Sequence, residues 1–305
     1  MGGMMRKFQQ LPQDDEIFLD HHGHFVPNMD QASEALERLG FRLTPYTAHT
    51  MRTSPDEDPK PSGTGNRCIM LRESYIEVLC AEGDAPMAKQ LREAVQRYTG
   101  IHLMAFTSSN AEAQHARLSA AGFEMQPLVH LTRQVEGGTL RFSVVRMIHG
   151  QMAEGRIQFL THNTPDLLWR EELMEHPNKV ISMTDVVMAS ADPQEAVQRF
   201  ERYLGFTPSA CEGGSRFSLG RGSLTILTAE AFQAALPGAE IPNLPYIGGY
   251  SLQSENLKTT KAILNGNGIE TQEIALNTIR VEPLPALGST MIFTQGDAVA
   301  PWMAY

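Results

Sequence analysis

The pattern of apolar and polar residues along the chain predicts a strand, then a helix, then a sharp exit from the helix. In Leu19–Phe41 a short alternating stretch is broken at Pro27, and from Ala32 onward apolar residues recur at helical spacing. Gly40 stands where a left-handed residue ends a helix, because glycine adopts that conformation without strain. Three later segments end in the same way: Arg117–Phe123, Phe200–Phe206 and Ala262–Ile269.

The exit glycines are evenly spaced along the chain. They are Gly40, Gly122, Gly205 and Gly268, separated by 82, 83 and 63 residues. A strand candidate precedes each helix, in Leu19–Val26, Ile101–Phe106, Met183–Ala189 and Gly248–Leu252. After two further short strand candidates a closing strand follows, in Ser74–Leu79, Gly155–Thr161, Gly222–Thr228 and Gly288–Thr294. The sequence therefore predicts a βαβββ unit four times over.

One such unit cannot bury both faces of its sheet, so the units must pair around a shared hollow with helices outside. We therefore expect an α+β fold of four βαβββ modules, paired into two domains with curled mixed sheets. The first domain spans 17–162 and the second 180–305. The connector 163–179 is expected to be ordered, with Thr164 as the N-cap of a short helix and Pro165 at its first position.

The segment Pro45–Asn66 interrupts this regularity. It holds four prolines and the acidic run Asp56–Asp58, so it is too polar to pack as a core element. A surface loop is the simpler interpretation. A lid over the first hollow is the alternative, because the segment lies between strands that would line that hollow.

Composition narrows the class of protein. The 305 residues carry a formal net charge of −10, which argues against nucleic acid as a partner. Three widely spaced cysteines fit a reducing compartment, and neither a signal peptide nor a membrane span is recognisable. We expect a cytoplasmic protein that acts on a small molecule and does not bind membranes. This composition is compatible with a homodimer.

Candidate chemistry emerges when the four units are aligned. Counting back from the turn after each first strand gives His21, His102, Asp185 and Gly248. Aligning the closing strands gives Glu77, Gln158, Thr225 and Met291. The pairs His21–Glu77 and His102–Gln158 both have a separation of 56 residues, which places His21, Glu77, His102 and Gln158 together in the first domain.

Two imidazoles and a carboxylate on converging strands suit a divalent Fe, Mn, Ni, Co or Zn ion, with the Gln158 amide oxygen as a weak fourth ligand. Open coordination positions would remain for water or substrate. The second domain offers Asp185, Thr225, Gly248 and Met291 at the matching places, which cannot make such a site. We therefore expect the second domain to be structural, or to complete the substrate pocket, and to bind no metal.

The paired repeat resembles the vicinal oxygen chelate superfamily, which includes glyoxalase I, extradiol dioxygenases and fosfomycin resistance proteins. The resemblance is carried by LDHHGHFVP at the start of a unit and YIEVL at its end, and covers nearly the whole chain. Gly63–Leu71 (GTGNRCIML) and Gln158–Arg170 (QFLTHNTPDLLWR) resemble a glyoxalase-like branch of that superfamily.

The resemblance implies metal ligands from the first and last strands of paired units, a pattern that His21, Glu77 and His102 match. Gln158 departs from it, because the matching residue is often a glutamate, which in glyoxalase I is linked to proton abstraction. Extradiol dioxygenases often hold their metal in the C-terminal half, which here lacks ligand types. The candidate catalytic residues are therefore His162, which shares a strand face with Gln158, and Gln158 itself, with a metal-bound hydroxide as the alternative base.

Two functions follow. The first is a divalent-metal-dependent enzyme of the lyase, isomerase or dioxygenase type, acting in the N-terminal hollow on a small oxygen-bearing substrate. The second is a metal-free protein of the same fold that binds or sequesters a small molecule. On the other face of the first strand, His22 and His24 are expected to be packing residues.

Overall fold

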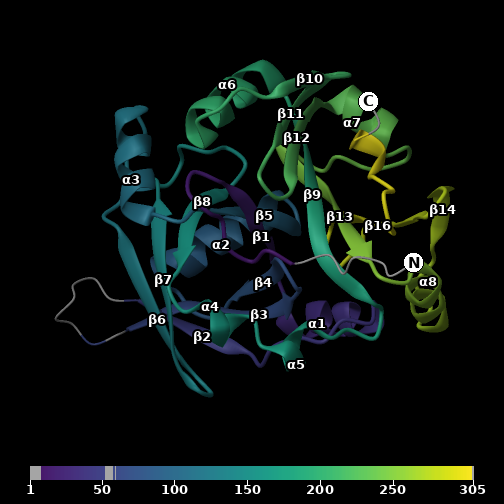
Figure 1. The fold of residues 1–305 in the computed structure, drawn as a ribbon, viewed down its shortest axis with the longest axis horizontal. Coiled ribbons are helices and arrows are strands. Elements are labelled where there is room, and N and C mark those ends of the chain that lie inside the picture. The colour runs from purple at the N-terminus through teal and green to yellow at the C-terminus, as the bar shows by residue number, and fades with distance from the viewer. Residues whose placement is uncertain (1–7, 52–57, 59, 304–305) are drawn as a thin grey trace.

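The computed structural model describes residues 8–51, 58 and 60–303, and it confirms the four βαβββ units (Figure 1). The first unit consists of β1 (Phe18–Phe25), α1 (Met29–Arg38), β2 (Thr47–Met51), β3 (Lys60–Met70) and β4 (Tyr75–Ala81). The second consists of β5 (Gly100–Thr107), α3 (Ala111–Ala120), β6 (Val129–Val135), β7 (Gly138–Arg146) and β8 (Arg156–His162).

The C-terminal half repeats this order. The third unit consists of β9 (Val180–Ser190), α6 (Pro193–Leu204), β10 (Ser209–Cys211), β11 (Gly214–Ser218) and β12 (Ser223–Thr228). The fourth consists of β13 (Tyr246–Ser254), α8 (Leu257–Gly266), β14 (Gln272–Ala275), β15 (Thr278–Val281) and β16 (Thr290–Thr294). Elements outside the units are α2 (Pro86–Arg97), α4 (Pro165–Leu168), α5 (Glu171–Met174), α7 (Ala229–Ala235) and the 3-10 turn η1 (Pro301–Met303).

The helix of each unit begins and ends in the same way. An Asn or Asp side chain at the N-cap accepts a hydrogen bond from the backbone three residues on, which satisfies a free N–H of the first turn; these caps are Asn28, Asn110, Asp192 and Asn256. The predicted exit glycines all have positive φ, at 82°, 87°, 86° and 72°. The evenly spaced glycines of the sequence are thus left-handed residues that turn the chain back toward the sheet.

The units pair, as expected, and they do so through their first strands. β1 runs antiparallel to β5 in the N-terminal half, and β9 runs antiparallel to β13 in the C-terminal half. A single pairing, Ile247 with Ile101, joins β13 to β5, so that one curled sheet runs through both halves. In Figure 1 the N-terminal half lies at the left and bottom, and the C-terminal half lies at the top and right. The division into separate domains at 163–179 stays a prediction.

Each half of the sheet has an inner face, which the sheet curls around, and an opposite face. In the N-terminal half the inner face carries His21, Glu77, Ala105 and Gln158, because directly paired residues share a face and residues two apart return to it. The opposite face forms the main core with the unit helices, through side chains such as Leu36, Leu118 and Phe200. This core is continuous between the two halves.

Two helices that the sequence analysis did not predict, α2 and α7, cover the inner faces. Leu91 of α2 packs with Phe25, Leu79 and Leu103 in the N-terminal half. In the C-terminal half, Phe232 and Leu236 of α7 pack with Val187 and Leu227, and Trp302 of η1 joins them. The second inner face is therefore filled by apolar side chains, whereas the first keeps a polar region beside its apolar one.

The connector is ordered, with α4 and α5 in it. Thr164 precedes α4, but its hydroxyl accepts from the backbone of Arg141 instead of capping the helix. Buried His176 and Asn178 bind the connector to the first unit, through Met70 O and Leu39 O.

Pro45–Asn66 is in part a strand pair, contrary to the expectation of a loop. Thr47 pairs with Asn66 and Ala48 with Gly65, so β2 and the start of β3 extend the sheet at its edge. The prolines and acidic residues at 52–57 and 59 lie outside the described residues, so the lid alternative stays a prediction.

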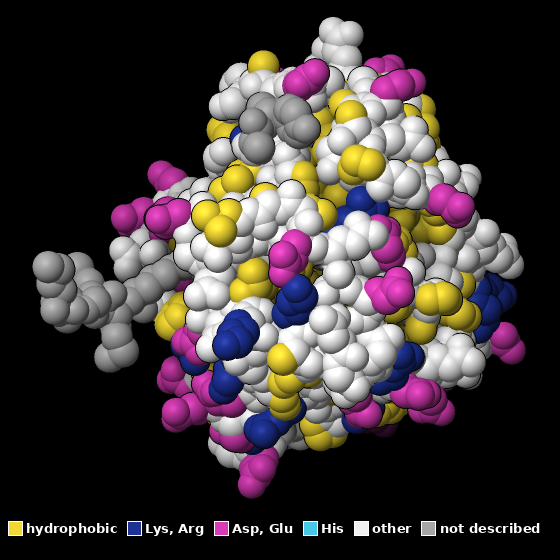
Figure 2. Space-filling view, turned by 90° about the vertical axis from the view of Figure 1, so that its right-hand side faces the viewer, with side chains coloured by type: hydrophobic (Ala, Val, Ile, Leu, Met, Phe, Trp, Pro, Cys, Tyr) yellow, Lys and Arg dark blue, Asp and Glu magenta, His cyan; other side chains and the backbone are white. Residues whose placement is uncertain are grey.

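The face in Figure 2 shows basic and acidic side chains interspersed among apolar and uncharged ones. Among the helices of the described ranges, none is both long enough and apolar enough to cross a membrane.

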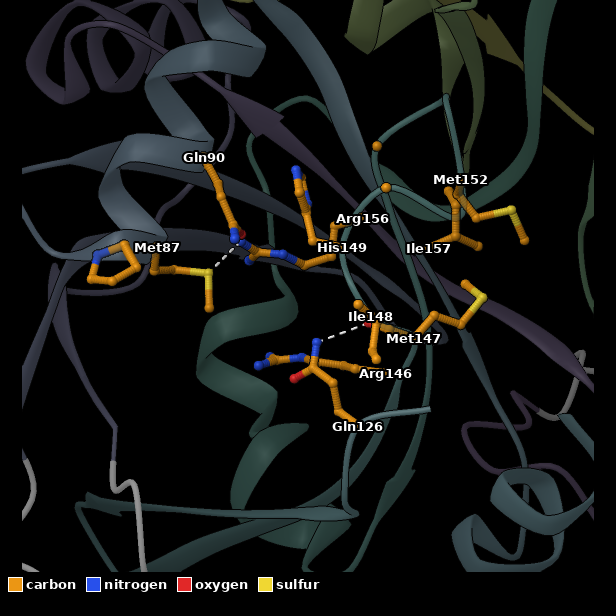
Figure 3. A pocket seen from close by; sticks show the side chains of 13 residues that line it. Met87, Gln90, Gln126, Arg146, Met147, Ile148, His149, Met152, Arg156 and Ile157 are labelled. Carbon is orange, nitrogen blue, oxygen red and sulfur yellow. Dashed lines mark hydrogen bonds between the residues drawn. The ribbon is translucent and has the colours of Figure 1, made fainter. Parts of the chain in front are cut away.

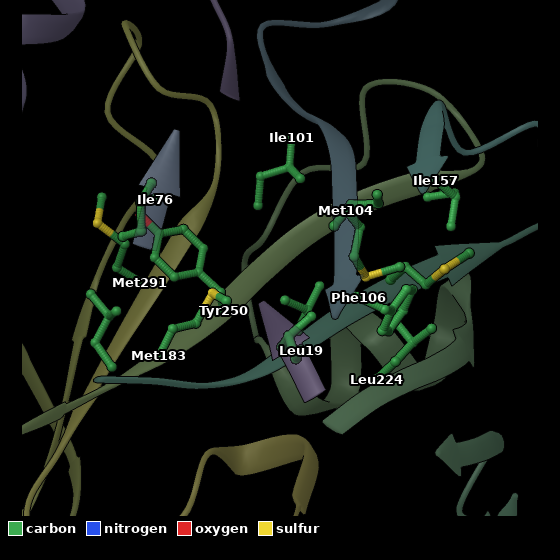
Figure 4. Close-up of a cluster of buried hydrophobic side chains, with 14 of the residues drawn as sticks. Leu19, Ile76, Ile101, Met104, Phe106, Ile157, Met183, Leu224, Tyr250 and Met291 are labelled. Carbon is green, nitrogen blue, oxygen red and sulfur yellow. The ribbon is translucent and has the colours of Figure 1, made fainter. Parts of the chain in front are cut away.

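A seam of buried histidines joins the two halves behind β1. His22 and His24 contact each other and the ring of Tyr250, and His24 Nδ1 donates to Leu287 O at 2.8 Å. Figure 4 shows the surrounding side chains, in which Leu19 and Met104 of one half meet Met183 and Tyr250 of the other. His22 and His24 are packing residues, as expected, but they pack against the C-terminal half.

A bidentate ion pair supports the same junction. Arg199 of α6 donates to both carboxylate oxygens of Glu154, at 2.7 and 3.0 Å, and both residues are buried. Because breaking a buried pair leaves a charge without compensation, this contact holds α6 firmly against the second unit.

Burial of the seam predicts that the fold loses stability in mild acid. Burial lowers the pKa of His24 from 6.5 to about 4, so the folded state keeps this imidazole neutral while the unfolded chain takes up a proton. The His24 contribution is therefore fully present above pH 6.5 and is lost as pH falls toward 4. Between pH 7 and pH 5 this loss amounts to about 2 kcal/mol of unfolding free energy.

Denaturant unfolding at these two pH values measures the effect. In the variant His24→Asn, whose amide can still donate to Leu287 O, the loss between pH 7 and pH 5 should be smaller by about 2 kcal/mol. An equal loss in the variant and in the natural protein would show that His24 does not stay neutral in the fold.

Candidate active site in the N-terminal half

The strand register brings three of the predicted site residues onto one inner face. His21 pairs with Ala105 of β5, which in turn pairs with Gln158 of β8. On its other side His21 pairs with Tyr75 of β4, two residues before Glu77. The His21 ring stacks on Tyr75 with centroids 4.1 Å apart. The inner face thus holds an imidazole, a carboxylate and an amide in neighbouring strands.

Asp20 is the residue that organises this face. Its Oδ2 lies 2.7 Å from His21 Nδ1, and its Oδ1 lies 2.7 Å from His162 Nε2. Burial alone would raise the pKa of this fully buried carboxyl, but the charges and hydrogen bonds of His162 and His21 outweigh burial and lower it. An ionised carboxylate only accepts hydrogen bonds, so both facing ring nitrogens carry the donated protons.

A β-bulge in β1 explains how Asp20 and His21, which are neighbours in the strand, come to lie in the same cluster of side chains. In the pairing of β1 with β5, Leu19 opposes Phe106 and His21 opposes Ala105, which leaves Asp20 as the extra residue. A bulge re-aims a side chain that strict alternation would send to the other face. Asp20 therefore joins His21 instead of pointing away from it.

Across the site, Glu77 faces the second nitrogen of His21. Its Oε2 lies 3.8 Å from His21 Nε2, and its Oε1 accepts a hydrogen bond from Asn66 Nδ2. Burial raises the pKa of Glu77, but His21, His49, Asn66 and Arg133 together lower it. With Nδ1 donating to Asp20, the neutral form of His21 presents the lone pair of Nε2 toward this carboxylate. The gap between them therefore favours a proton, a donor group or a cation.

Gln158 and His162 are placed differently from the prediction. Gln158 Oε1 accepts a hydrogen bond from Arg146 Nε at 3.0 Å, so a guanidinium occupies the oxygen that was predicted to face a metal. His162 lies on the same face as Gln158, as expected, but its Nε2 is bound to Asp20 and its ring packs against Trp169. Its Nδ1 is buried without a partner.

His102 is not brought to the site, because the predicted equivalence with His21 is off by one residue. Leu103, not His102, pairs with Arg156, two residues before Gln158, just as His21 pairs with Tyr75, two residues before Glu77. His102 lies at a bulge in β5. Its ring stacks on Tyr98, and its Nε2 lies 2.8 Å from Tyr98 O.

The side chains as placed do not fit a metal site. His21 and Glu77 supply two ligands on the inner face, whereas a catalytic metal is usually held by three. Within residues 8–51, 58 and 60–303, no three His, Cys, Asp or Glu side chains form a group that could hold a metal ion. The hydrogen bond that His21 donates to Asp20 is one that metal-binding histidines often make, but a buried base uses it equally well.

Comparison with known proteins settles the family. A model of the glyoxalase-like domain matches residues 19–209. The chain belongs to the glyoxalase-like domain family. Among curated proteins, no sequence matches it.

Solved structures share the fold of this glyoxalase-like protein at low identity. A hypothetical protein from Staphylococcus aureus is 12% identical, with a TM-score of 0.65 over 92% of this chain and 100% of that one. A variant of 4-hydroxymandelate synthase from Streptomyces coelicolor is 13% identical, with a TM-score of 0.58 over 94% and 95%. A xylose isomerase-like TIM barrel/4-hydroxyphenylpyruvate dioxygenase fusion protein is 13% identical, with a TM-score of 0.59 over 95% of this chain and 51% of that one.

The C-terminal half of the glyoxalase-like protein has a different inner face. Asp185 accepts hydrogen bonds from the hydroxyls of Ser223 and Ser251, and Thr225 is fully buried beside them. Met291 pairs with Tyr250 on the opposite face, so Ile292 takes the inner position that Met291 was expected to occupy. The predicted structural role of this half stays a prediction.

Sequence reasoning missed Asp20, Asn66, His49 and the arginines of the inner face. Asp20 was missed because nothing in the sequence marks its bulge. Asn66 and His49 lie in the segment that was expected to be a loop. Arg133 and Arg146 stand in β6 and β7, whose register the sequence does not fix, and Arg156 was overlooked although it stands two residues before Gln158 in a predicted closing strand.

Asp20 should matter more to stability than the comparable carboxylate of the C-terminal half. In Asp20→Asn one oxygen is replaced by a donor, which leaves an imidazole N–H without its acceptor unless that ring changes tautomer. In Asp185→Asn the serine hydroxyls can rotate to donate or accept. We expect Asp20→Asn to lower the unfolding free energy by roughly 1–3 kcal/mol more than Asp185→Asn. Denaturant unfolding at pH 7 measures both, and equal losses would contradict the role given to Asp20.

Proposed function

We propose that this glyoxalase-like protein is an enzyme in which His21 acts as the general base on a small oxygen-bearing substrate in the N-terminal hollow. One observation carries the proposal: His21 lies between two carboxylates, with Asp20 on Nδ1 at 2.7 Å and Glu77 3.8 Å from Nε2. Asp20 fixes the ring and its tautomer. A proton taken up at Nε2 would give an imidazolium that both carboxylates stabilise.

The supported reaction class is proton abstraction next to a carbonyl, which leads to isomerisation or elimination. Such a step creates negative charge on the carbonyl oxygen, and positive or donor groups must meet it. Arg133, Arg146 and Arg156 all lie near enough to Glu77 to influence its charge or to be influenced by it. The inner face thus combines a base with guanidinium groups that can stabilise an oxyanion.

Exchange of substrate protons tests the base. The natural protein should catalyse deuterium exchange at carbon in a panel of small 2-oxo and 2-hydroxy carbonyl compounds, followed by NMR in D₂O. His21→Asn keeps a donor toward Asp20 but lacks Nε2, so its exchange rate should fall by about 10²–10⁴-fold. The control His130→Asn changes an exposed histidine of β6 and should leave exchange unchanged. Exchange that survives in His21→Asn would remove His21 from the mechanism.

The metal-dependent form of this activity remains a second candidate. It is favoured by the family resemblance and by the two carboxylate contacts of His21, and it needs at least one ligand beyond His21 and Glu77. Elemental analysis of protein purified without chelator tests it. A metal bound in stoichiometric amount and lost in the double variant His21→Ala, Glu77→Ala would support it. Metal that is substoichiometric, or unchanged in that variant, would leave the metal-free base.

Binding without turnover is the remaining outcome. If a metabolite panel raises the melting temperature but no compound exchanges protons, the N-terminal hollow is a sequestering site. The proposal also places the protein in the cytoplasm, a location supported by the free thiols of Cys68, Cys80 and Cys211.

A further inference from the structure

Two arginines line a pocket beside the inner face. Arg146 ends β7 and Arg156 begins β8, and both border a pocket of about 230 Å³ between these strands and α2. Gln90 and Met87 of α2 form the facing wall. Figure 3 shows the two guanidinium groups extending to the same side of the pocket, with that of Arg156 beside Met87 and Gln90 of α2. The pocket is therefore bordered by two cations from adjacent strands.

These guanidinium groups lack an acidic partner. Arg146 Nε donates to Gln158 Oε1 at 3.0 Å, and Arg156 Nη2 lies 2.7 Å from Met87 Sδ. Among the described residues, no carboxylate lies within salt-bridge distance of either group. A guanidinium has five N–H donors, and a thioether is a weak acceptor, so most of the donor capacity of the pair is unused.

Their surroundings make the positive charge costly. Burial is the main reason that the pKa of Arg146 falls to about 10, and the positive charge of Arg156 nearby adds to the effect. Burial also lowers the pKa of Arg156. Glu77 acts on both in the opposite direction, but one carboxylate cannot balance two guanidinium groups, and it already accepts from Asn66. A bound anion would supply the missing charge.

We propose that the pocket binds the oxyanion head group of a small organic anion, held between Arg146 and Arg156. Planar guanidinium groups bind carboxylate and phosphate oxygens through parallel hydrogen bonds, which gives both affinity and orientation. The inference rests on the proposed function, since it names a class of substrate for the His21 base: a molecule with an oxyanion at one end, bound in this pocket beside the inner face, and an acidic carbon at the other.

The distance to His21 limits the size of that substrate. Gln158, which Arg146 contacts, lies two strands from His21 through Ala105. With neighbouring strands about 4.8 Å apart, the backbones at Gln158 and His21 are about 10 Å apart. Arg146 and His21 lie on the same inner face, so the substrate has to span a gap of this order between its anionic group and its reacting carbon. The rest of the pocket wall includes the apolar side chains of Met87, Met147 and Met152 and the polar side chains of Gln126 and His149.

Anion-dependent stabilisation tests the proposal without requiring turnover. Melting temperatures are measured with inorganic phosphate and with acetate, pyruvate and benzoate, each against chloride at equal ionic strength. We expect at least one of these anions to raise the melting temperature in a saturable way. Stabilisation by phosphate alone would favour a phosphorylated substrate, and stabilisation by the carboxylates would favour an organic acid.

Arginine variants locate the site. Arg146→Met and Arg156→Met should each weaken the affinity for the stabilising anion by about tenfold or more, because each removes a charge-assisted contact. Arg141→Met removes an exposed arginine of the same strand β7 and should leave the affinity unchanged. Arg146→Lys and Arg156→Lys keep the positive charge but remove the planar guanidinium group, so each should still weaken anion binding. They replace the methionine variants if either of those fails to fold.

The test of the anion site can be separated from the test of His21 as the general base. His21→Asn should bind the anion as the natural protein does, even when proton exchange is lost. Anion binding that is retained in both arginine variants, or no stabilisation by any of the four anions, would overturn the anion site. Absence of proton exchange in the natural protein, or exchange that survives in His21→Asn, together with arginine-dependent anion binding, would overturn the base and leave the anion site standing.

Discussion

Alternation along a strand is the constraint on which this structure depends. In β1, successive side chains point to opposite faces, and both faces are fully used. His21 and Phe25 lie on the inner face, and His22 and His24 lie in the seam against the C-terminal half. The bulge at Asp20 is a local exception, and it places a carboxylate where alternation would not allow one. One strand therefore carries both the candidate chemistry and the junction of the molecule.

The two halves show how one repeat leads to different interiors. Both cover their inner face with a helix that follows a closing strand, α2 in one and α7 in the other. In the C-terminal half, Trp302 and Phe232 complete an apolar filling, and the single carboxylate Asp185 is satisfied by serine hydroxyls. In the N-terminal half the carboxylates contact imidazoles instead. An imidazole ring nitrogen can accept or donate a proton, so this inner face has a capacity for acid–base chemistry that serine hydroxyls do not provide.

Much of the fold followed from the sequence, because its signals are local. A glycine at a helix exit and a short alternating strand depend on a few neighbouring residues, and the order of sixteen strands and four unit helices was predicted from them. α2 and α7 were missed because they fall between repeats, where the repeat pattern gives no guidance. The site was predicted less well, since it depends on register. His21, Glu77 and Gln158 were placed on one face, but a one-residue difference in β5 turned His102 away.

The arrangement of β1 also has a consequence for how such a chain can change over time. Substitutions on its inner face can alter chemistry while the seam is preserved, and substitutions in the seam can adjust the junction while the chemistry is preserved. An inserted or deleted residue within β1 offers no such independence, because it exchanges the two faces beyond that point. The length of β1 is thus held fixed by the inner face and by the seam at once.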